Sequence, residues 1–253
     1  MAFRSSFRFF LLASTLVGCS PRVISEAVLD EPYYPVDSLV QPNAEALTTI
    51  SPYKNQLGEE MKTAIGTAAH AITNDPGRGE SALGNLAADL ILTKSRERYD
   101  EVDLSVINAH GGLRVPINKG PILVENIYEV MPFDNTIYIY SLSGPLTLKL
   151  FDHCAGTLRN VIGGASFKIE GSKAIDIVIG NEPFDNSKSY VLAISDYLAS
   201  GGNGFGFVGD QGEFLKDINY LQRDMIIDFI KDLTKEGVEI SSEIDGRMKR
   251  LDE

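Results

Sequence analysis

Residues 80–114 have the sequence ESALGNLAADLILTKSRERYDEVDLSVINAHGGLR and contain the strongest secondary-structure signals of the chain. Over residues 80–99, apolar residues recur at helical spacing, and basic residues follow in the last turn. Alternating apolar residues over 102–106 then predict a β-strand, which we expect to end in a turn at Gly111-Gly112. The stretch therefore predicts a helix, a strand and a glycine turn in succession.

Helices and strands are expected on both sides of this stretch. Ser51-Pro52 is a typical helix-start signal, and residues 64–72 favour a buried strand, although a helix is not excluded. Helices are expected from Pro145 and over residues 220–233, and strands over 137–142, 165–169, 174–179 and 190–194. This irregular alternation favours a mixed α/β domain over a regular doubly wound sheet.

Composition excludes several classes of protein. The 253 residues include 35 acidic and 23 basic side chains, a formal charge of −12, so a broad nucleic-acid-binding face is not expected. No apolar run outside the N-terminus is long enough to cross a membrane, which argues against a multi-span membrane protein. An apolar fraction of 43% suffices for a folded core, and one domain over residues 51–253 is the simplest organisation.

The N-terminus is typical of an export signal. Residues 1–18 combine two arginines with a short apolar run, and the sequence Leu-Val-Gly-Cys at 16–19 resembles a bacterial lipobox. We therefore expect a lipoprotein signal peptide over 1–18, lipidation of Cys19, a proline-containing tether over 19–50 and a lipid-anchored protein of the bacterial cell envelope. An ordinary secretory signal with an incidental cysteine is the alternative.

Metal and nucleophile chemistry have little support in the sequence. The three histidines, at positions 70, 110 and 153, have no metal-ligand spacing, and no Gly-x-Ser-x-Gly motif is present. Cys154 lies in an apolar periodic run, which favours a buried thiol over a nucleophile. We therefore expect neither a metal site nor a catalytic residue in this chain.

Three segments are candidates for ligand binding. Asn108–Arg114 ends a strand with two glycines and an arginine, which suits an anionic oxygen but equally fits a glycine turn with a solvated arginine. Met131–Asn135 places Phe133 beside a proline, as a stacking platform or as a core corner. Residues 200–207 are rich in glycine, but no helix typical of a dinucleotide-binding motif follows them.

Taken in order, four segments carry a family resemblance. The chain resembles the C-terminal domain of the 5′-nucleotidase family over roughly residues 50–245, through ESALGNLAAD at 80–89, GGLR at 111–114, MPFDN at 131–135 and SDYLASGGNGF at 195–205. The resemblance implies a layered α/β/β/α domain that binds the nucleotide. In that family a separate N-terminal metallophosphoesterase domain supplies two metal ions and the catalytic His-Asp pair.

The resemblance also implies a role for each matching residue. Arg114 would contact the phosphate, with Arg78 assisting, and Phe133 and Tyr197 would enclose the base between their rings. The asparagines would form hydrogen bonds to the base or the sugar, namely Asn108, Asn135 and Asn203. Gly111 and Gly112 would allow the backbone to approach the ligand closely.

The chain departs from the family pattern at three of these positions. Asn203 stands where the family usually has an aspartate that holds the ribose hydroxyls, which should weaken that contact by ~1–2 kcal/mol. Tyr197 replaces the usual phenylalanine, a mild change. Asn108 is one residue further from Arg114 than in the family motif Asn-x-Gly-Gly-Ile-Arg, with His110 in the interval.

The Asp-x-His and Gly-Asn-His motifs of the family's metal-binding half do not occur in this sequence. We therefore expect the nucleotide-binding half of a split 5′-nucleotidase, a phosphoric monoester hydrolase by resemblance that is inactive alone. A separate metallophosphoesterase polypeptide would hold the divalent metal ions, and Cys19 would provide the membrane contact. The alternative is a non-catalytic surface protein that binds nucleosides, nucleotides or another flat ligand.

Overall fold

The computed structural model describes residues 37, 39–75 and 79–251. The predicted signal peptide, Cys19, Arg78 and most of the predicted tether lie outside these residues. Chain contacts divide the protein into two compact units, with the division between Leu47 and Thr48. The second unit contains every candidate binding residue that the structure describes, and it is the subject of the following sections.

The first helix, α1 (Ala44–Met61), begins earlier than the Ser51-Pro52 signal predicts. Asn43 precedes it, and its Oδ1 accepts a hydrogen bond of 2.9 Å from the Ala46 N–H, as an N-cap residue does. Pro52 therefore lies inside the helix, where it removes one backbone hydrogen bond. None of the helices in the described part of the chain combines the length and apolar character that crossing a membrane requires.

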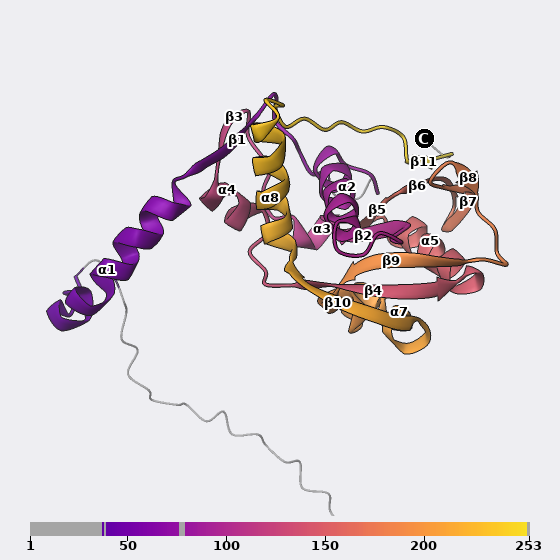
Figure 1. Ribbon diagram of the computed structural model, residues 1–253, viewed down its shortest axis with the longest axis horizontal. Helices are drawn as coiled ribbons and strands as arrows, with labels where there is room; N and C mark the ends of the chain where they lie inside the picture. Colours follow the sequence, from indigo (N-terminus) through magenta and orange to yellow (C-terminus); the bar gives the residue numbers. More distant parts are fainter. Residues whose placement is uncertain (1–36, 38, 76–78, 252–253) are drawn as a thin grey trace, which may run out of the picture. The chain divides into compact units, whose positions relative to one another are not determined.

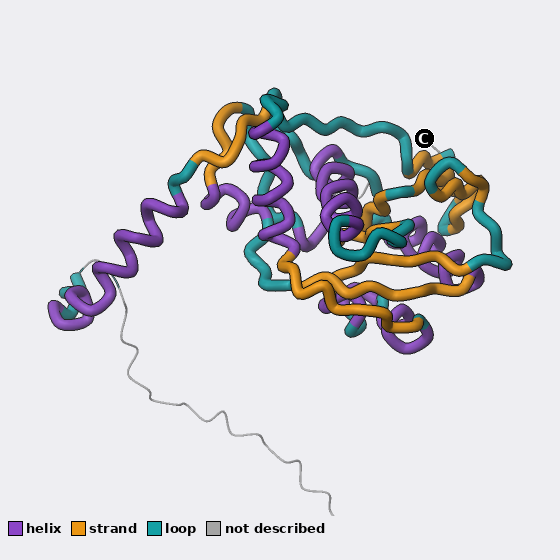
Figure 2. The backbone as a smooth tube through the Cα atoms, in the orientation of Figure 1, coloured by secondary structure: helices purple, strands orange, loops and turns teal. Residues whose placement is uncertain are grey.

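A five-stranded sheet forms the centre of the second unit, as Figures 1 and 2 show. β2 and β9 run parallel, whereas the other neighbouring strands run antiparallel. The strand order is β10 (Glu213–Leu221), β4 (Thr136–Ser143), β9 (Ser189–Ser195), β2 (Leu104–Asn108) and β5 (Asn160–Gly163). All five residues of β2 are buried or half-buried, because the strand lies in the interior of this sheet.

Two smaller sheets and several short helices complete the described fold. One sheet pairs β1 (Ala64–Ala68) with β3 (Gly120–Leu123), and the other has the order β11 (Met248–Arg250), β6 (Ala165–Glu170), β7 (Lys173–Ile179) and β8 (Glu182–Pro183). The short helices are α3 (Ala109–Gly112), α4 (Val124–Val130), α6 (Asp196–Ala199), the 3₁₀ turn η1 (Gly202–Gly204) and α7 (Gly206–Gln211).

The predicted central helix is α2 (Ala82–Arg96), which packs against β2 and β5. Ser81 caps it by accepting a hydrogen bond of 3.1 Å from the Gly84 N–H, so the helix begins two residues after Glu80. Gly84 permits close packing on the sheet, since a Cβ at this position would lie only 2.7 Å from a methyl carbon of Val161. The apolar periodicity of α2 is thus explained by its contact with the sheet.

The helix predicted from Pro145 is α5 (Gly144–Thr157), with proline in its first turn. It packs against β7 and also contacts β4, β5 and β9, so it touches strands of both larger sheets. Cys154 is fully buried on its inner face, and this burial raises the pKa of the thiol. The expectation that Cys154 is buried is confirmed, and its lack of reactivity stays a prediction.

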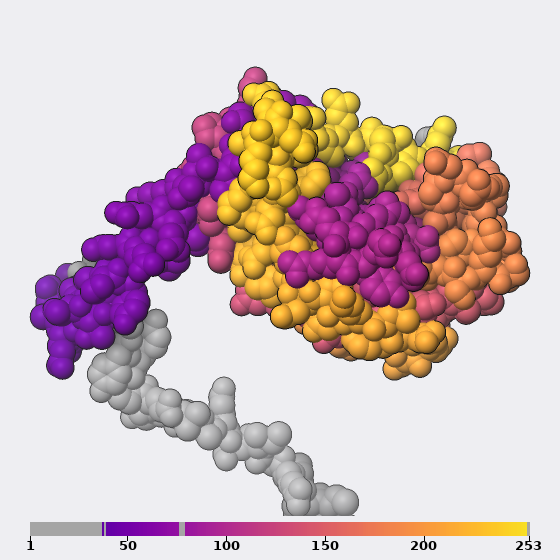
Figure 3. All heavy atoms as spheres, viewed as in Figure 1, coloured from indigo at the N-terminus to yellow at the C-terminus, as the bar shows by residue number. Residues whose placement is uncertain are grey.

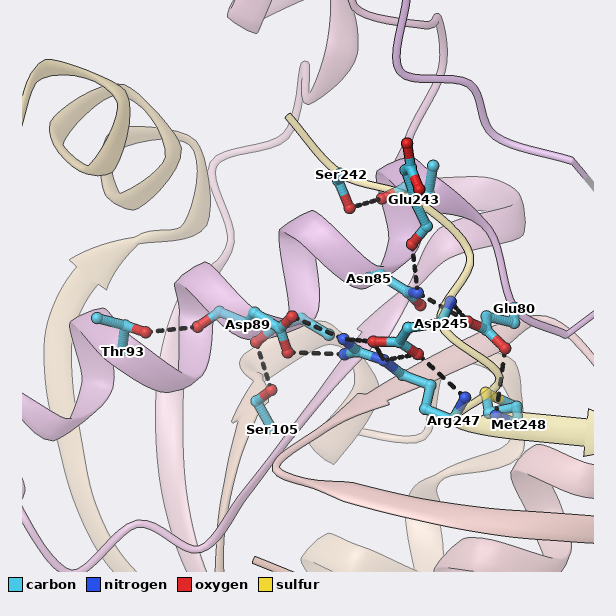
Figure 4. A network of polar contacts seen from close by, with 12 residues as sticks. Glu80, Asn85, Asp89, Thr93, Ser105, Ser242, Glu243, Asp245, Arg247 and Met248 are labelled. Atoms are coloured by element: carbon cyan, nitrogen blue, oxygen red, sulfur yellow. Dashed lines mark hydrogen bonds and ion pairs between the residues drawn. The ribbon is translucent and has the colours of Figure 1, made fainter. Parts of the chain in front are cut away.

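The last helix, α8 (Gln222–Lys235), and the C-terminal residues adjoin α2 on the face seen in Figure 3. Figure 4 shows the side chains of Glu80, Asp245 and Arg247 converging beside α2. Glu80 Oε1 accepts hydrogen bonds from the Asp245 and Gly246 N–H groups at 2.7 and 3.0 Å. Both terminal nitrogens of Arg247 donate hydrogen bonds to the Asp89 carboxylate, at 2.7 and 2.8 Å. These bonds connect the C-terminal segment to α2.

Two further local expectations are wrong. The predicted turn at Gly111-Gly112 is the helical turn α3, because Asn108 caps it. Tyr220 and Leu221 belong to β10 and not to the last helix, since β10 pairs with β4 up to the Leu221–Thr136 partners. The mixed α/β class is as predicted.

Candidate functional site

One end of the five-stranded sheet brings distant segments together. β2 and β9 are parallel neighbours, so Asn108 at the end of β2 and Ser195 at the end of β9 lie at the same edge. β4 is antiparallel to β9 and begins at this edge, next to Asn135. Ligand sites of α/β sheets commonly form outside the carboxyl ends of parallel strands.

A pocket of about 580 Å³ lies at this edge, and we call it the β2–β9 pocket. Its volume falls within the range of small-ligand sites, roughly 300–1,000 Å³. Eight of the nine predicted binding residues line it, namely Asn108, Gly111, Gly112, Arg114, Phe133, Asn135, Tyr197 and Asn203. The ninth, Arg78, lies outside the described residues. The structure thus brings the eight together, and their binding roles remain predictions.

The glycine segment after β2 is held by its own first residue. Asn108 Oδ1 accepts a hydrogen bond of 3.1 Å from the Gly111 N–H and caps α3. Asn74, which is not part of α3, also binds this helical turn. Its Nδ2 donates hydrogen bonds to the Ala109 and Leu113 carbonyls at 2.6 and 3.3 Å. The oxygen of Asn108 therefore has a structural partner within α3.

Arg114 follows α3 and its side chain is exposed. Its Nη1 donates to the Gly111 carbonyl at 3.3 Å, and among the described residues it forms no ion pair with an acid. A guanidinium without a carboxylate partner keeps its donors available for an anion.

Two partly exposed aromatic side chains lie at the pocket. Phe133 is 40% exposed and Tyr197 is 48% exposed, and both line the β2–β9 pocket. Met131, two residues before Phe133, is buried. Phe133 is therefore exposed at the pocket and not packed into the core, whereas Met131 of the same segment is buried.

Asp196 joins the segments that carry these two rings. Its Oδ1 accepts hydrogen bonds from Asn135 Nδ2 at 2.9 Å and from the Tyr197 N–H at 2.7 Å. One donor of Asn135, which was expected to bind the ligand, is thus engaged within the protein. Sequence reasoning assigned no role to Asp196.

The two substituted positions, Tyr197 and Asn203, lie against each other. The Tyr197 hydroxyl donates to Asn203 Oδ1 at 3.4 Å, the long end of the hydrogen-bond range. Asn203 has a φ of 52°, in the left-handed region that asparagine tolerates. Its carbonyl accepts a hydrogen bond of 2.9 Å from His153 Nε2, which holds this loop on α5. His153 is therefore a structural residue of the pocket loop.

The start of α8 supplies two further residues that the sequence motifs do not contain. Gln222 lines the β2–β9 pocket, and its N–H donates to the Asn135 carbonyl at 2.9 Å. Arg223 is buried, donates to the Phe133 carbonyl at 3.5 Å and forms an ion pair with Asp134. Both residues contact the Met131–Asn135 segment, although Arg223 and Phe133 are 90 positions apart in the sequence.

Metal binding has no candidate among the residues that the structure describes. No group of three or more histidine, cysteine, aspartate and glutamate side chains in this part of the chain could hold a metal ion.

Comparisons with known proteins agree with the fold and the order of the motifs. Residues 64–210 match the family described as 5′-nucleotidase, C-terminal domain. The trifunctional nucleotide phosphoesterase of Bacillus subtilis is 24% identical over 86% of this chain, and the NAD 5′-nucleotidase of Haemophilus influenzae is 26% identical over 66% of it. The crystal structure of a 5′-nucleotidase precursor from Thermus thermophilus superposes with a TM-score of 0.69 and 25% identity over 83% of the chain.

The chain corresponds to only part of each of these proteins. It spans 16% of the Bacillus protein, 32% of the Haemophilus protein and 43% of the Thermus structure. The family match covers residues 64–210, which include the four motif segments up to residue 205 and the whole of the five-stranded sheet except β10. The chain therefore belongs to the family of the 5′-nucleotidase C-terminal domain.

Proposed function

We propose that this domain binds a nucleotide in the β2–β9 pocket, with the base at Phe133 and Tyr197 and the phosphate at Arg114. The observation that carries the proposal is that one cavity is lined by two half-exposed aromatic rings and by a guanidinium that has no acidic partner among the described residues. Aromatic rings stack on any planar base, and a guanidinium fork fits phosphate oxygens. The relatives named as nucleotidases and nucleotide phosphoesterases support this ligand class.

We further propose that the domain is the substrate-binding half of a two-chain 5′-nucleotidase. A separate metallophosphoesterase polypeptide would supply two divalent metal ions that activate the attacking water. In this chain, Arg114 would offset the phosphate charge, and the two rings would fix the orientation of the base. The support is that named phosphoesterases share this domain, which is a minor part of their length.

The first experiment measures AMP binding and AMP hydrolysis by the purified protein. We expect calorimetry to show AMP binding, and we expect no hydrolysis with Mn²⁺ or Zn²⁺ until a co-purifying metallophosphoesterase is added. Turnover by the metal-loaded protein free of contaminants would contradict the two-chain proposal. Absence of AMP binding would contradict the nucleotide pocket. AMP binding without any phosphoesterase in a pull-down would instead favour a non-catalytic surface binding protein.

We also propose that Cys19 is lipidated and anchors the protein in the bacterial cell envelope, on the basis of the lipobox-like sequence at 16–19. A multiply acylated cysteine gains about 0.8 kcal/mol for each buried methylene group, which is sufficient for stable anchoring. Cell fractionation is expected to find the protein with membranes and the Cys19→Ala variant in the soluble fraction. An equal distribution of both proteins would exclude Cys19 as the anchor.

A further inference from the structure

The first residue of α8 carries an unpaired polar group at the β2–β9 pocket. Gln222 is only 3% exposed and lines the pocket. Its backbone is held by the hydrogen bond of 2.9 Å to the Asn135 carbonyl. Its side-chain Nε2, in contrast, is buried and has no hydrogen-bond partner among the described residues.

An amide donor in this situation is unfavourable in the unliganded protein. Burying an amide without a hydrogen bond costs free energy that water would otherwise offset, and buried polar groups in folded proteins are generally paired. The pocket lining includes acceptor side chains such as those of Asp134 and Ser195, but none of the described residues accepts a hydrogen bond from Gln222 Nε2. This donor is therefore available to a molecule that enters the pocket.

The side chain is able to make this contact with little movement. Rotation about the terminal torsion of glutamine is soft and has broad minima, so the amide turns without displacing the backbone. Asn135, whose carbonyl accepts from the Gln222 N–H, already donates its side-chain Nδ2 to Asp196 at 2.9 Å. Of these two neighbouring amides, Gln222 is the one whose donor nitrogen has no described hydrogen-bond partner.

We propose that Gln222 is a specificity-determining residue, which donates a hydrogen bond to an acceptor on the inner edge of the ligand's heteroaromatic ring. The proposal rests on the proposed nucleotide-binding function. Stacking on Phe133 and Tyr197 accepts any flat ring, whereas a directed amide selects rings that present a nitrogen or carbonyl acceptor at that edge. The ligand class is therefore a nucleoside phosphate with such a base, and sugar phosphates without a base lose this contact.

The test compares AMP with ribose 5-phosphate on the full chain and on the Gln222→Leu variant, by calorimetry. Leucine keeps the approximate volume and removes the donor. We expect AMP affinity to fall about five- to tenfold, as for the loss of one hydrogen bond, and ribose 5-phosphate affinity to remain unchanged. Because leucine also removes an unpaired buried amide, the unliganded variant is expected to unfold at the same or a higher temperature.

Two further variants make the result decisive. Gln222→Met keeps the length and the neutral charge of the side chain but removes the donor, so the same selective loss of AMP affinity is expected even if the leucine variant folds poorly. Gln211→Leu, at an exposed glutamine of α7, is the control and should leave both affinities unchanged. Unchanged AMP affinity in both Gln222 variants, or an equal loss for both ligands, would overturn the proposal. A wild-type protein that binds neither ligand would instead overturn the proposed function itself.

Discussion

Replacing Arg114 by alanine is expected to lower the affinity for AMP about 10- to 100-fold, which corresponds to the loss of ~1.5–3 kcal/mol for a hydrogen bond to a charged group. The expectation follows from the position of Arg114 at the β2–β9 pocket and from the absence of an ion pair among the described residues. Adenosine has no phosphate, so its affinity should not change. Calorimetry with both ligands measures this difference.

A matched control separates a direct phosphate contact from a general change in charge. Lys119 is an exposed base five positions after Arg114 and does not line the β2–β9 pocket. Lys119→Ala removes the same charge and is expected to change AMP affinity less than twofold, because surface charges are screened over about 8–10 Å at physiological salt. Equal losses in the two variants, or an equal loss of adenosine binding by Arg114→Ala, would exclude a phosphate contact at Arg114.

Replacing Glu80 by alanine is expected to lower the free energy of unfolding by about 3 kcal/mol, a large effect for one side chain. Glu80 is 5% exposed, and its carboxylate accepts hydrogen bonds from Asn85 Nδ2 and from the N–H groups of Asp245, Gly246 and Met248 (Figure 4). Alanine would leave these donors without their acceptor beside α2. Urea denaturation measures the change through the midpoint and slope of the transition.

The effect of Glu80→Ala should be concentrated in the C-terminal segment. Hydrogen exchange is expected to show the largest loss of protection in residues 245–248, whose backbone donors lose Glu80. Glu243→Ala is the control, because Glu243 is exposed and contributes only its backbone carbonyl, to Asn85 at 3.0 Å. The control should remain within about 0.5 kcal/mol of the wild type. A similar small change for Glu80→Ala would show that the hydrogen bonds of Glu80 do not stabilise the fold.

Elements with a strong local pattern could be predicted from the sequence. Helices α2 and α5 and strands β4, β6, β7 and β9 lie within a few residues of their predicted positions. Their apolar residues repeat with the period of the element, because one face of each is buried. The four-residue β5 and three-residue β11 were not predicted, since strands this short have too few residues to show a period. They form by pairing with β2 and β6.

The candidate site was predicted only in part. Eight residues were found because they lie in contiguous motifs, and the parallel pairing of β2 with β9 explains why segments 108–114 and 195–203 meet. Gln222 and Arg223 lie outside these motifs, and Asp196 lies inside one of them but had no predicted role. Aspartate, glutamine and arginine near the start of a helix are common in any protein, and these acquire their roles from contacts with the Met131–Asn135 segment.

The order of the amino acids was sufficient to determine the α/β class, the central helix and strand and the family of the domain, because periodicity and motif spacing are properties of neighbouring residues. The cap on α3, the contact between Tyr197 and Asn203 and the unpaired amide of Gln222 depended on the folded structure. Sheet pairing and burial between residues far apart in the sequence decide which side chains find a partner and which remain open to a ligand.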